Sequence, residues 1–298
     1  MRKATSLQEI FDVYYFPRNL DIRSPDTKRQ YAFALKDLAA ALGRPPTLAD
    51  LTDESITRLL SHLQAKGVAP RTANERAGRF FALWRFLASR GELKTWPTPQ
   101  KLHVPKKTPW AWTEDELQRL ILACHATPGF VGHIPAGWWW GSLHRVLWCS
   151  GERISALLAC RWDWLADEWL TIPAESRKGQ TEDRTYRLDP QTIESLEVIR
   201  RPKRDLIWLW PGSHVEIWRH YKRLRQRAGL ASDRRSSFHR MRRSVASHYE
   251  AAGGNATELL GHSDRRLTKN SYLDPRFSKV PQALDKLKPI DGRRNPGE

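Results

Sequence analysis

The chain has 298 residues and a mass of 34.6 kDa, which is enough for about two domains of ordinary size. It carries 50 Lys and Arg against 33 Asp and Glu, so its net charge is +17 and its pI is about 10.1, and such a surplus indicates a polyanionic partner, either nucleic acid or an acidic membrane surface. A hydrophobic content of 40% excludes disorder along the whole chain, and the lack of any run of about 20 apolar residues excludes a membrane-spanning helix.

Several common chemistries have no motif in this sequence. There is no GxGxxG, GxxxxGK[ST], HExxH, GxSxG or paired CxxC, so we predict no nucleotide cofactor and no metal site. The amino terminus has basic residues without an apolar region behind them, so no signal peptide is expected. Cys124, Cys149 and Cys160 lie in apolar segments, as reduced cysteines of a cytoplasmic protein do.

The first 95 residues are predicted to form a compact helical domain. Helices are expected over residues 25–42, 53–66 and 70–90, because each begins after a capping residue or with a proline and each ends at a glycine. Residues 1–107 have a net charge of +9 and the remainder a net charge of +8, so both halves can face the same polyanion. On the third helix the apolar residues share one side, and basic residues that include Arg71, Arg76 and Arg79 lie between them.

A basic, proline-rich linker over residues 96–112 separates this domain from the rest. The segment contains four prolines and three lysines, and because proline fixes φ and lacks an N–H, neither a helix nor a central strand is expected there. Lys106 and Lys107 of this linker are predicted to contact phosphates. We therefore place the domain boundary in this segment.

The second domain is predicted over residues 113–276. Thr113 and Glu116 match a capping box, and residues 137–150 are rich in Trp and Leu, as in a buried helix. Two strands follow, over 169–173 and 184–188, joined by a polar turn. Further helices are expected at about 190–200, 213–229, 239–252 and 264–273, and the tail over 277–298 is polar except for a few residues suited to one short amphipathic helix.

Cationic and donor side chains occur at helix starts and turns of this second domain. Arg153 follows the glycine that ends the buried helix, and Lys178 lies in the turn between the strands. His239 and Arg242 are three residues apart, so they share one face of a helix whose N-terminus suits a phosphate. His262 and Tyr272 follow. Taken singly, each has a plainer explanation, as a surface arginine, a solvated lysine, a basic helix along DNA or a packing tyrosine.

Taken together, in this order and spacing, these residues resemble the tyrosine recombinase (phage integrase) family. Residues 5–95 are similar to its helical, SAM-like core-binding domain, and residues 110–275 to its catalytic domain, which is mostly helical with a small antiparallel sheet. The resemblance implies that Arg153 and Arg242 clamp the scissile phosphate with help from His239 and His262. It also implies that Lys178 is the general acid and that Tyr272 is the nucleophile.

Two positions depart from the family pattern. The family has an acidic residue three places after the first arginine, and here that position is Ala156. Glu152 is the nearest acid, but we expect it to point elsewhere on a helix. Arg243 stands where the family usually has a second histidine, and it adds positive charge where the phosphate lies.

The expected function is site-specific recombination of double-stranded DNA through a 3′-phosphotyrosyl intermediate, without ATP or metal. The resemblance implies a homotetramer on two DNA sites, with the tail over 277–298 packed on a neighbouring subunit. Further phosphate contacts are predicted along the helix over 213–229, from Arg219, Lys222, Arg223, Arg225 and Arg227.

Two alternatives remain: a type IB topoisomerase-like enzyme that relaxes DNA, and a non-catalytic DNA-binding relative. The sequence leaves open whether the exchange integrates or excises a mobile genetic element, exchanges a cassette or resolves a dimer. We expect the protein in the cytoplasm, associated with the nucleoid when it is bound to DNA.

Overall fold

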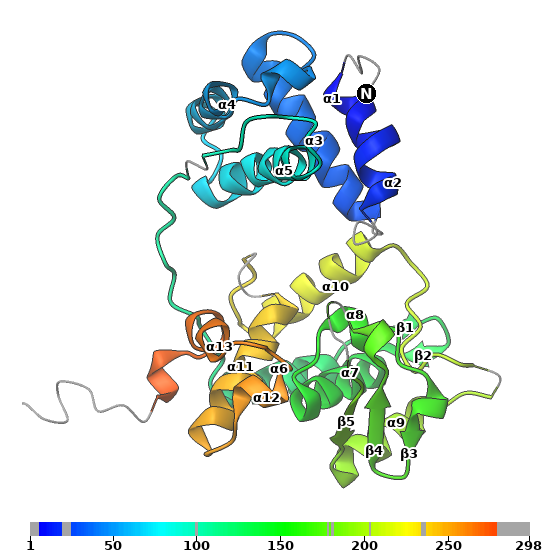
Figure 1. The fold of residues 1–298 in the computed structure, drawn as a ribbon. Helices are drawn as coiled ribbons and strands as arrows, with labels where there is room; N and C mark the ends of the chain where they lie inside the picture. Colours follow the sequence, from blue (N-terminus) through cyan, green and yellow to red (C-terminus); the bar gives the residue numbers. More distant parts are fainter. Residues whose placement is uncertain are drawn as a thin grey trace, which may run out of the picture. The chain divides into compact units, whose positions relative to one another are not determined.

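The structure is a computed structural model, and it describes residues 6–19, 25–98, 101–177, 179, 182–202, 204–233 and 237–278. The chain divides into two compact units, Met1–Lys106 and Lys107–Glu298, with the division inside the predicted linker. The fold is mainly helical with small antiparallel sheets, as the sequence predicts (Figure 1). Within the described ranges, none of the helices has the length and apolar character needed to cross a membrane.

The first unit is a helical bundle around one apolar core. Its three long helices begin and end close to the predicted residues, and Thr52 caps the second of them by accepting a hydrogen bond from the backbone N–H of Ser55. The amino-terminal helical segment was not predicted, and it includes one turn of π-helix that places Phe11 in the core. The elements are α1 (Leu7–Glu9), η1 (Ile10–Tyr15), α2 (Phe16–Arg18), α3 (Pro25–Leu42), η2 (Leu48–Asp50), α4 (Asp53–Ala65) and α5 (Pro70–Ser89).

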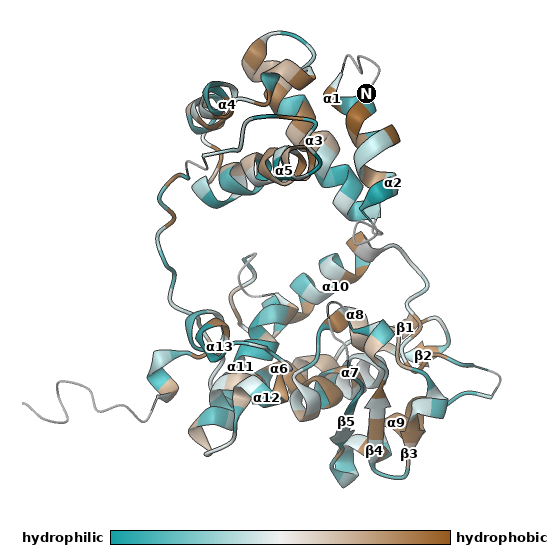
Figure 2. Ribbon diagram, in the orientation of Figure 1, coloured by the Kyte–Doolittle hydropathy of each residue, from teal (hydrophilic) through white to brown (hydrophobic). Residues whose placement is uncertain are grey.

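The second unit packs its helices around α7, which the sequence predicted as buried. This helix carries Trp139 and Trp140, both of which are covered, because α6, α9 and α11 lie against it. In Figure 2 most of α10 has the hydrophilic colour, as expected for a helix with one face on the core. The helices are α6 (Glu114–His125), α7 (Ala136–Ser150), α8 (Ile154–Leu157), α9 (Pro190–Ile199), α10 (His214–Arg227), α11 (Phe238–Ala251), α12 (Ala256–Leu259) and α13 (Arg265–Ser271).

Two small antiparallel sheets complete this unit. The larger has the order β3-β4-β5, and its register pairs Leu170 with Leu165 on one side and with Tyr186 on the other. Leu170 and Tyr186 are buried, so this sheet contributes one face to the core. The strands are β1 (Phe130–Val131), β2 (Ile134–Pro135), β3 (Leu165–Ala166), β4 (Trp169–Ile172) and β5 (Arg184–Arg187), with short 3-10 turns η3 (Trp162–Trp164), η4 (Ala174–Ser176) and η6 (Pro275–Phe277).

The two ends of the linker are held by different units. In the first unit, Asn74 exchanges two hydrogen bonds of 2.9 Å with the backbone of Leu102. In the second unit, the backbone N–H of Ala111 donates to Asp274 at 2.7 Å, and Arg276 donates to the Ala111 carbonyl at 2.8 Å. The chain between these anchors, residues 103–110, has no helix or strand, as its prolines predict.

Candidate active site

The site begins at the end of α7, where the chain turns sharply. Gly151 has a φ of +61°, and a Cβ there would lie 3.1 Å from Val245 and 3.2 Å from Leu260, so the turn favours glycine in conformation and in space. After this turn Glu152 and Arg153 lie outside any helix, and Arg153 is the N-cap of α8. Both side chains therefore start from the junction of two helices.

Arg242 lies on α11 and its side chain is only 1% exposed. Its guanidinium donates to the carbonyl of Gly151 at 2.6 Å and to the carbonyl of Leu260 at 2.8 Å, and it approaches His262 Nε2 at 3.5 Å. Burial lowers the pKa of Arg242, and the carboxylate of Glu152 opposes that shift. The guanidinium thus joins the end of α7, the loop after α12 and the predicted histidine.

Tyr272 follows α13 and lies beside His262. Their ring centroids are 4.7 Å apart, and Arg242 Cζ lies 5.6 Å from the centre of the Tyr272 ring. The backbone of Tyr272 is fixed at both ends, because its N–H donates to the Thr268 carbonyl at 2.9 Å and its carbonyl accepts from Ser247 Oγ at 3.1 Å. Phenol, imidazole and guanidinium therefore form one cluster, and the phenol is only half-buried.

Both predicted histidines are held in the neutral form. Burial, followed by the positive charges of Arg242 and Arg153, lowers the pKa of His262 to about 4. Loss of hydration, followed by the charges of Arg242, Arg243 and Arg153, also lowers the pKa of the more exposed His239. At pH 7 each imidazole is therefore neutral, and Arg153 belongs to the cations that lower both pKa values. In His262 both ring nitrogens have partners, because Nε2 faces an Arg242 N–H at 3.5 Å and Nδ1 lies 2.9 Å from Thr268 Oγ1.

Two arginine donors at this site have no hydrogen-bond partner among the described residues. They are Arg153 Nη1 and Arg242 Nε, and both atoms are buried. Buried polar groups in proteins are nearly always paired, so donors left over on two guanidiniums in one cluster indicate a place for an anion. Of the six predicted catalytic residues, the structure brings together Arg153, His239, Arg242, His262 and Tyr272, whereas Lys178 lies outside the described residues.

The expectation that Glu152 points elsewhere on a helix is wrong. The left-handed turn at Gly151 ends α7, so Glu152 is not helical, and its buried carboxylate faces Arg242 at 3.6 Å. Ala156, at the position where the family has an acid, is buried in the apolar core. The signal that could have revealed this arrangement is the glycine itself, because a residue two places after the end of a helix leaves that helix's face.

The predicted phosphate-binding arginines of α5 differ in exposure. The side chain of Arg71 is 81% exposed, whereas that of Arg76 is only 19% exposed and pairs with Asp37 at 3.4 Å. Arg79 donates to the carbonyl of Glu75 within its own helix. Arg71 is therefore the most exposed of these three arginines, although it pairs with Glu75 at 3.3 Å.

On the second unit the predicted cations are exposed, with two exceptions. Arg225 is buried and donates to the carbonyls of Ala231 and Asp233, so its predicted role on a phosphate-binding face is wrong. It shares the buried side of α10 with Tyr221, four residues earlier. Arg243 is half-buried and donates to the Ser271 carbonyl beside Tyr272. The exposed cations are Lys107, Arg219, Lys222, Arg223 and Arg227, and in the first unit Lys106.

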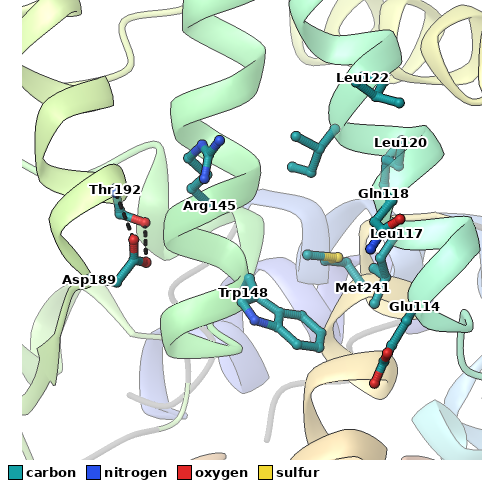
Figure 3. Close-up of a pocket in the computed structure, with 11 residues that line it drawn as sticks. Glu114, Leu117, Gln118, Leu120, Leu122, Arg145, Trp148, Asp189, Thr192 and Met241 are labelled. Atoms are coloured by element: carbon teal, nitrogen blue, oxygen red, sulfur yellow. Dashed lines mark hydrogen bonds between the residues drawn. The ribbon is translucent and has the colours of Figure 1, made fainter.

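An apolar groove of about 520 Å³ lies outside this cluster. Figure 3 shows Leu117 and Leu120 of α6 facing Trp148 of α7, with Met241 between them. None of the predicted catalytic residues lines it. In the described part of the chain, no three His, Cys, Asp or Glu side chains gather in a metal-binding arrangement.

Comparisons with known sequences match this chain to the phage integrase family and to tyrosine recombinases. The sequence profile described as the phage integrase family matches residues 111–279. The chain is 27% identical to a tyrosine recombinase XerD of Agrobacterium fabrum, over 86% of this chain and 87% of that protein. It is 26% identical to a tyrosine recombinase XerD of Caulobacter vibrioides, over 82% of this chain and 84% of that protein.

Solved structures share the fold. A Tn1549 transposon integrase in complex with transposon right end DNA superimposes with a TM-score of 0.69 at 14% identity, covering 94% of this chain and 96% of that one. A lambda integrase tetramer bound to a Holliday junction superimposes with a TM-score of 0.68 at 18% identity, covering 94% of this chain and 81% of that one. At these identities the likeness concerns the fold alone.

Proposed function

Because the chain belongs to the phage integrase family and is a tyrosine-type site-specific recombinase, we propose that it cleaves and rejoins double-stranded DNA through Tyr272. The observation that carries this proposal is a pair of arginines, Arg153 and Arg242, each with one buried donor that lacks a partner, beside a half-buried phenol. An anion between the arginines would lie within reach of that phenol. A scissile phosphate is the anion that such an arrangement suits.

The first step is a transesterification. Tyr272 Oη attacks the phosphorus, the P–O bond to the tyrosine forms, and the P–O bond to the 5′ oxygen breaks, leaving a 3′-phosphotyrosyl bond and a free 5′-hydroxyl. The neutral imidazole of His239 has a lone pair that can accept the phenol proton, whereas the two ring nitrogens of His262 face Arg242 and Thr268. Lys178, assigned from sequence alone, supplies a proton to the departing 5′ oxygen.

Arginine side chains stabilise the negative charge that develops on the phosphate. A planar guanidinium can donate two parallel hydrogen bonds to the non-bridging oxygens, so Arg153 and Arg242 can clamp them from fixed positions. The phosphotyrosyl bond conserves the energy of the phosphodiester, and a 5′-hydroxyl from another strand can therefore rejoin it. The reaction needs neither ATP nor a metal ion for this step.

The exposed cations supply contacts to the DNA backbone that do not depend on sequence. Arg71 in the first unit and Arg219, Lys222 and Arg223 on α10 are the main candidates, joined by Lys106 and Lys107 of the linker. Arg71 pairs with Glu75 at 3.3 Å but is 81% exposed, whereas Arg76 and Arg79 are partly buried, so their contribution is smaller. Arg243, beside the tyrosine segment, faces the phosphate nearest the reaction. Association with the nucleoid in the cytoplasm remains a prediction that follows from DNA binding.

A strand-exchange assay separates this function from DNA relaxation. With two copies of its recombination site, taken from the DNA that flanks the gene, the protein is expected to exchange strands. It is expected to leave a supercoiled plasmid without that site unrelaxed. Relaxation of the site-free plasmid would instead favour a type IB topoisomerase-like enzyme. If the protein neither exchanged strands nor formed a covalent adduct on any DNA, that result would favour a non-catalytic DNA-binding relative.

We further propose a homotetramer on two DNA sites, in which the tail over 277–298 packs on the neighbouring subunit. The apolar groove of Figure 3 is the receiving surface that we favour, since Leu122 is 67% exposed and Trp148 is 41% exposed there. The tail offers Val280, Leu284 and Leu287, in a sequence that is mostly polar. An interface between subunits requires apolar residues on both partners, and the groove and the tail sequence each supply them.

Deleting residues 279–298 is expected to leave DNA binding intact and to lower recombination at least tenfold, because the subunits lose their mutual contact. Leu122→Glu should have the same effect, since it places a charge in the groove. Val198→Glu, on the exposed side of α9, is the matched control and should recombine normally. Band-shift and recombination assays measure both properties. Normal recombination by the truncated protein would contradict the tail contact.

A further inference from the structure

A buried carboxylate lies at the centre of the active site. Glu152 is 1% exposed, and its Oε1 accepts hydrogen bonds from Arg177 Nε at 2.5 Å and from the Tyr186 hydroxyl at 2.8 Å. Its Oε2 accepts from the backbone N–H of Arg153 at 3.0 Å and faces Arg242 Nη1 at 3.6 Å. The carboxylate of Glu152 therefore contacts the backbone of Arg153 and the guanidinium of Arg242.

The charge balance around Glu152 is unusual for a protein interior. Arg242 and Arg177 have side chains that are 1% and 0% exposed, and Glu152 is the one acid that pairs with either of them in the described part of the chain. A buried cation without a partner is costly, so each guanidinium depends on this carboxylate for its place. Burial alone would raise the pKa of Glu152, but Arg242, Tyr186 and Arg177 hold that pKa below its usual range.

The same carboxylate reaches the turn that carries Lys178. Arg177 directly precedes that lysine in the sequence, and its Nη1 donates to the carbonyl of Glu182 at 2.8 Å, on the far side of the turn. Arg177 thus joins the two ends of the turn, and Glu152 fixes Arg177. The carboxylate connects the base of the β4–β5 turn with the arginine that clamps the phosphate.

We propose that Glu152 is a positioning residue for the recombination reaction: it holds the Arg242 guanidinium toward the scissile phosphate and, through Arg177, fixes the base of the turn that carries the general acid. This inference rests on the proposed function. It also accounts for Ala156, because the carboxylate that supports the second arginine comes from the residue before Arg153 rather than from the third residue after it. Glu152 does not itself touch the DNA.

Glu152→Gln tests this role, because glutamine keeps the shape and removes the charge. On a nicked suicide substrate the variant is expected to form covalent adduct about 100-fold more slowly than the wild type, the size expected when one fixed donor is lost. Its DNA affinity should stay within about threefold, since Glu152 is buried. Glu197→Gln is the matched control, because Glu197 pairs with Arg200 on the surface at 2.8 Å, and it should react at the wild-type rate.

A second substrate distinguishes positioning from a general loss of structure. A methylphosphonate at the scissile position replaces one charged oxygen by a methyl group, so it needs less positive charge from Arg242. On this substrate the deficit of Glu152→Gln should shrink to about tenfold or less. An equal deficit on both substrates, or no deficit on either, would overturn the proposal.

Tyr186→Phe gives an independent result if Glu152→Gln does not fold. It removes only the hydroxyl that donates to Glu152, and it should slow adduct formation at least threefold on the phosphate while leaving the methylphosphonate rate unchanged. If Glu152→Gln did not fold and Tyr186→Phe reacted with the phosphate substrate at the wild-type rate, the proposed positioning role of Glu152 would be contradicted. If the wild type itself forms no adduct, the proposed function fails instead, so the two failures are distinguishable.

Discussion

Tyr272→Phe is expected to abolish covalent protein–DNA adducts while DNA affinity stays within about twofold of the wild type. The phenol oxygen is the nucleophile in this account, and phenylalanine has no group that can attack phosphorus. The ring contacts with His262 and Arg242 do not involve that oxygen, and the two backbone hydrogen bonds of Tyr272 are independent of the side chain. The variant should therefore fold and bind normally.

A suicide substrate with a nick beside the scissile phosphate makes this result easy to measure. The adduct survives denaturing electrophoresis as a protein band that carries labelled DNA. Tyr249→Phe is the matched control, because Tyr249 lies on α11 with 45% of its surface exposed, and that variant should form adducts at the wild-type rate. Adducts formed by Tyr272→Phe at more than a trace level would show that another residue is the nucleophile.

Arg242→Lys is expected to lower the cleavage rate about 10²–10³-fold, which corresponds to about 3–4 kcal/mol of lost transition-state stabilisation. Lysine keeps the positive charge, but one ammonium cannot donate to the Gly151 and Leu260 carbonyls and also present a planar pair of donors to a phosphate. DNA affinity should change by less than about threefold, because the charge remains and most backbone contacts are made elsewhere.

Single-turnover cleavage and filter binding measure the two properties separately. Arg265→Lys is the control substitution, since Arg265 pairs with Glu250 at 2.6 Å on the surface with a side chain that is 67% exposed. It should cleave at the wild-type rate. Cleavage by Arg242→Lys at more than about a tenth of that rate would mean that charge alone, without the guanidinium geometry, is sufficient.

The helices were largely predictable because their boundaries are encoded locally. Thr113 and Glu116 form the predicted capping box of α6, and Thr52 caps α4 as expected. The π-helical turn over Ile10–Tyr15 and the two-residue strands β1 and β2 were missed, because an irregular turn has no sequence period and two residues cannot establish one. Local signals predict long elements well and short ones poorly.

The site was predictable in its residue types but not in its supporting contacts. The order and spacing of these residues resemble the tyrosine recombinase family, and that resemblance led to the cluster, of which five of the six members lie in the described part of the structure. Glu152 was misplaced because its role depends on the turn at Gly151 and on two residues distant in sequence, Tyr186 of β5 and Arg177 of the connection between β4 and β5. Arg225 was misread because basic residues on α10 were assigned to one surface, although this arginine lies on the side that is buried against the core.

The central claim is that the phenol of residue 272 becomes bonded to DNA beside Arg153, Arg242 and the two histidines. Protease digestion of the trapped adduct, followed by mass spectrometry of the peptide that carries the 3′-nucleotide, tests it most directly. The account predicts a single modified peptide with the nucleotide on Tyr272. A nucleotide on any other side chain, or on none, would contradict it.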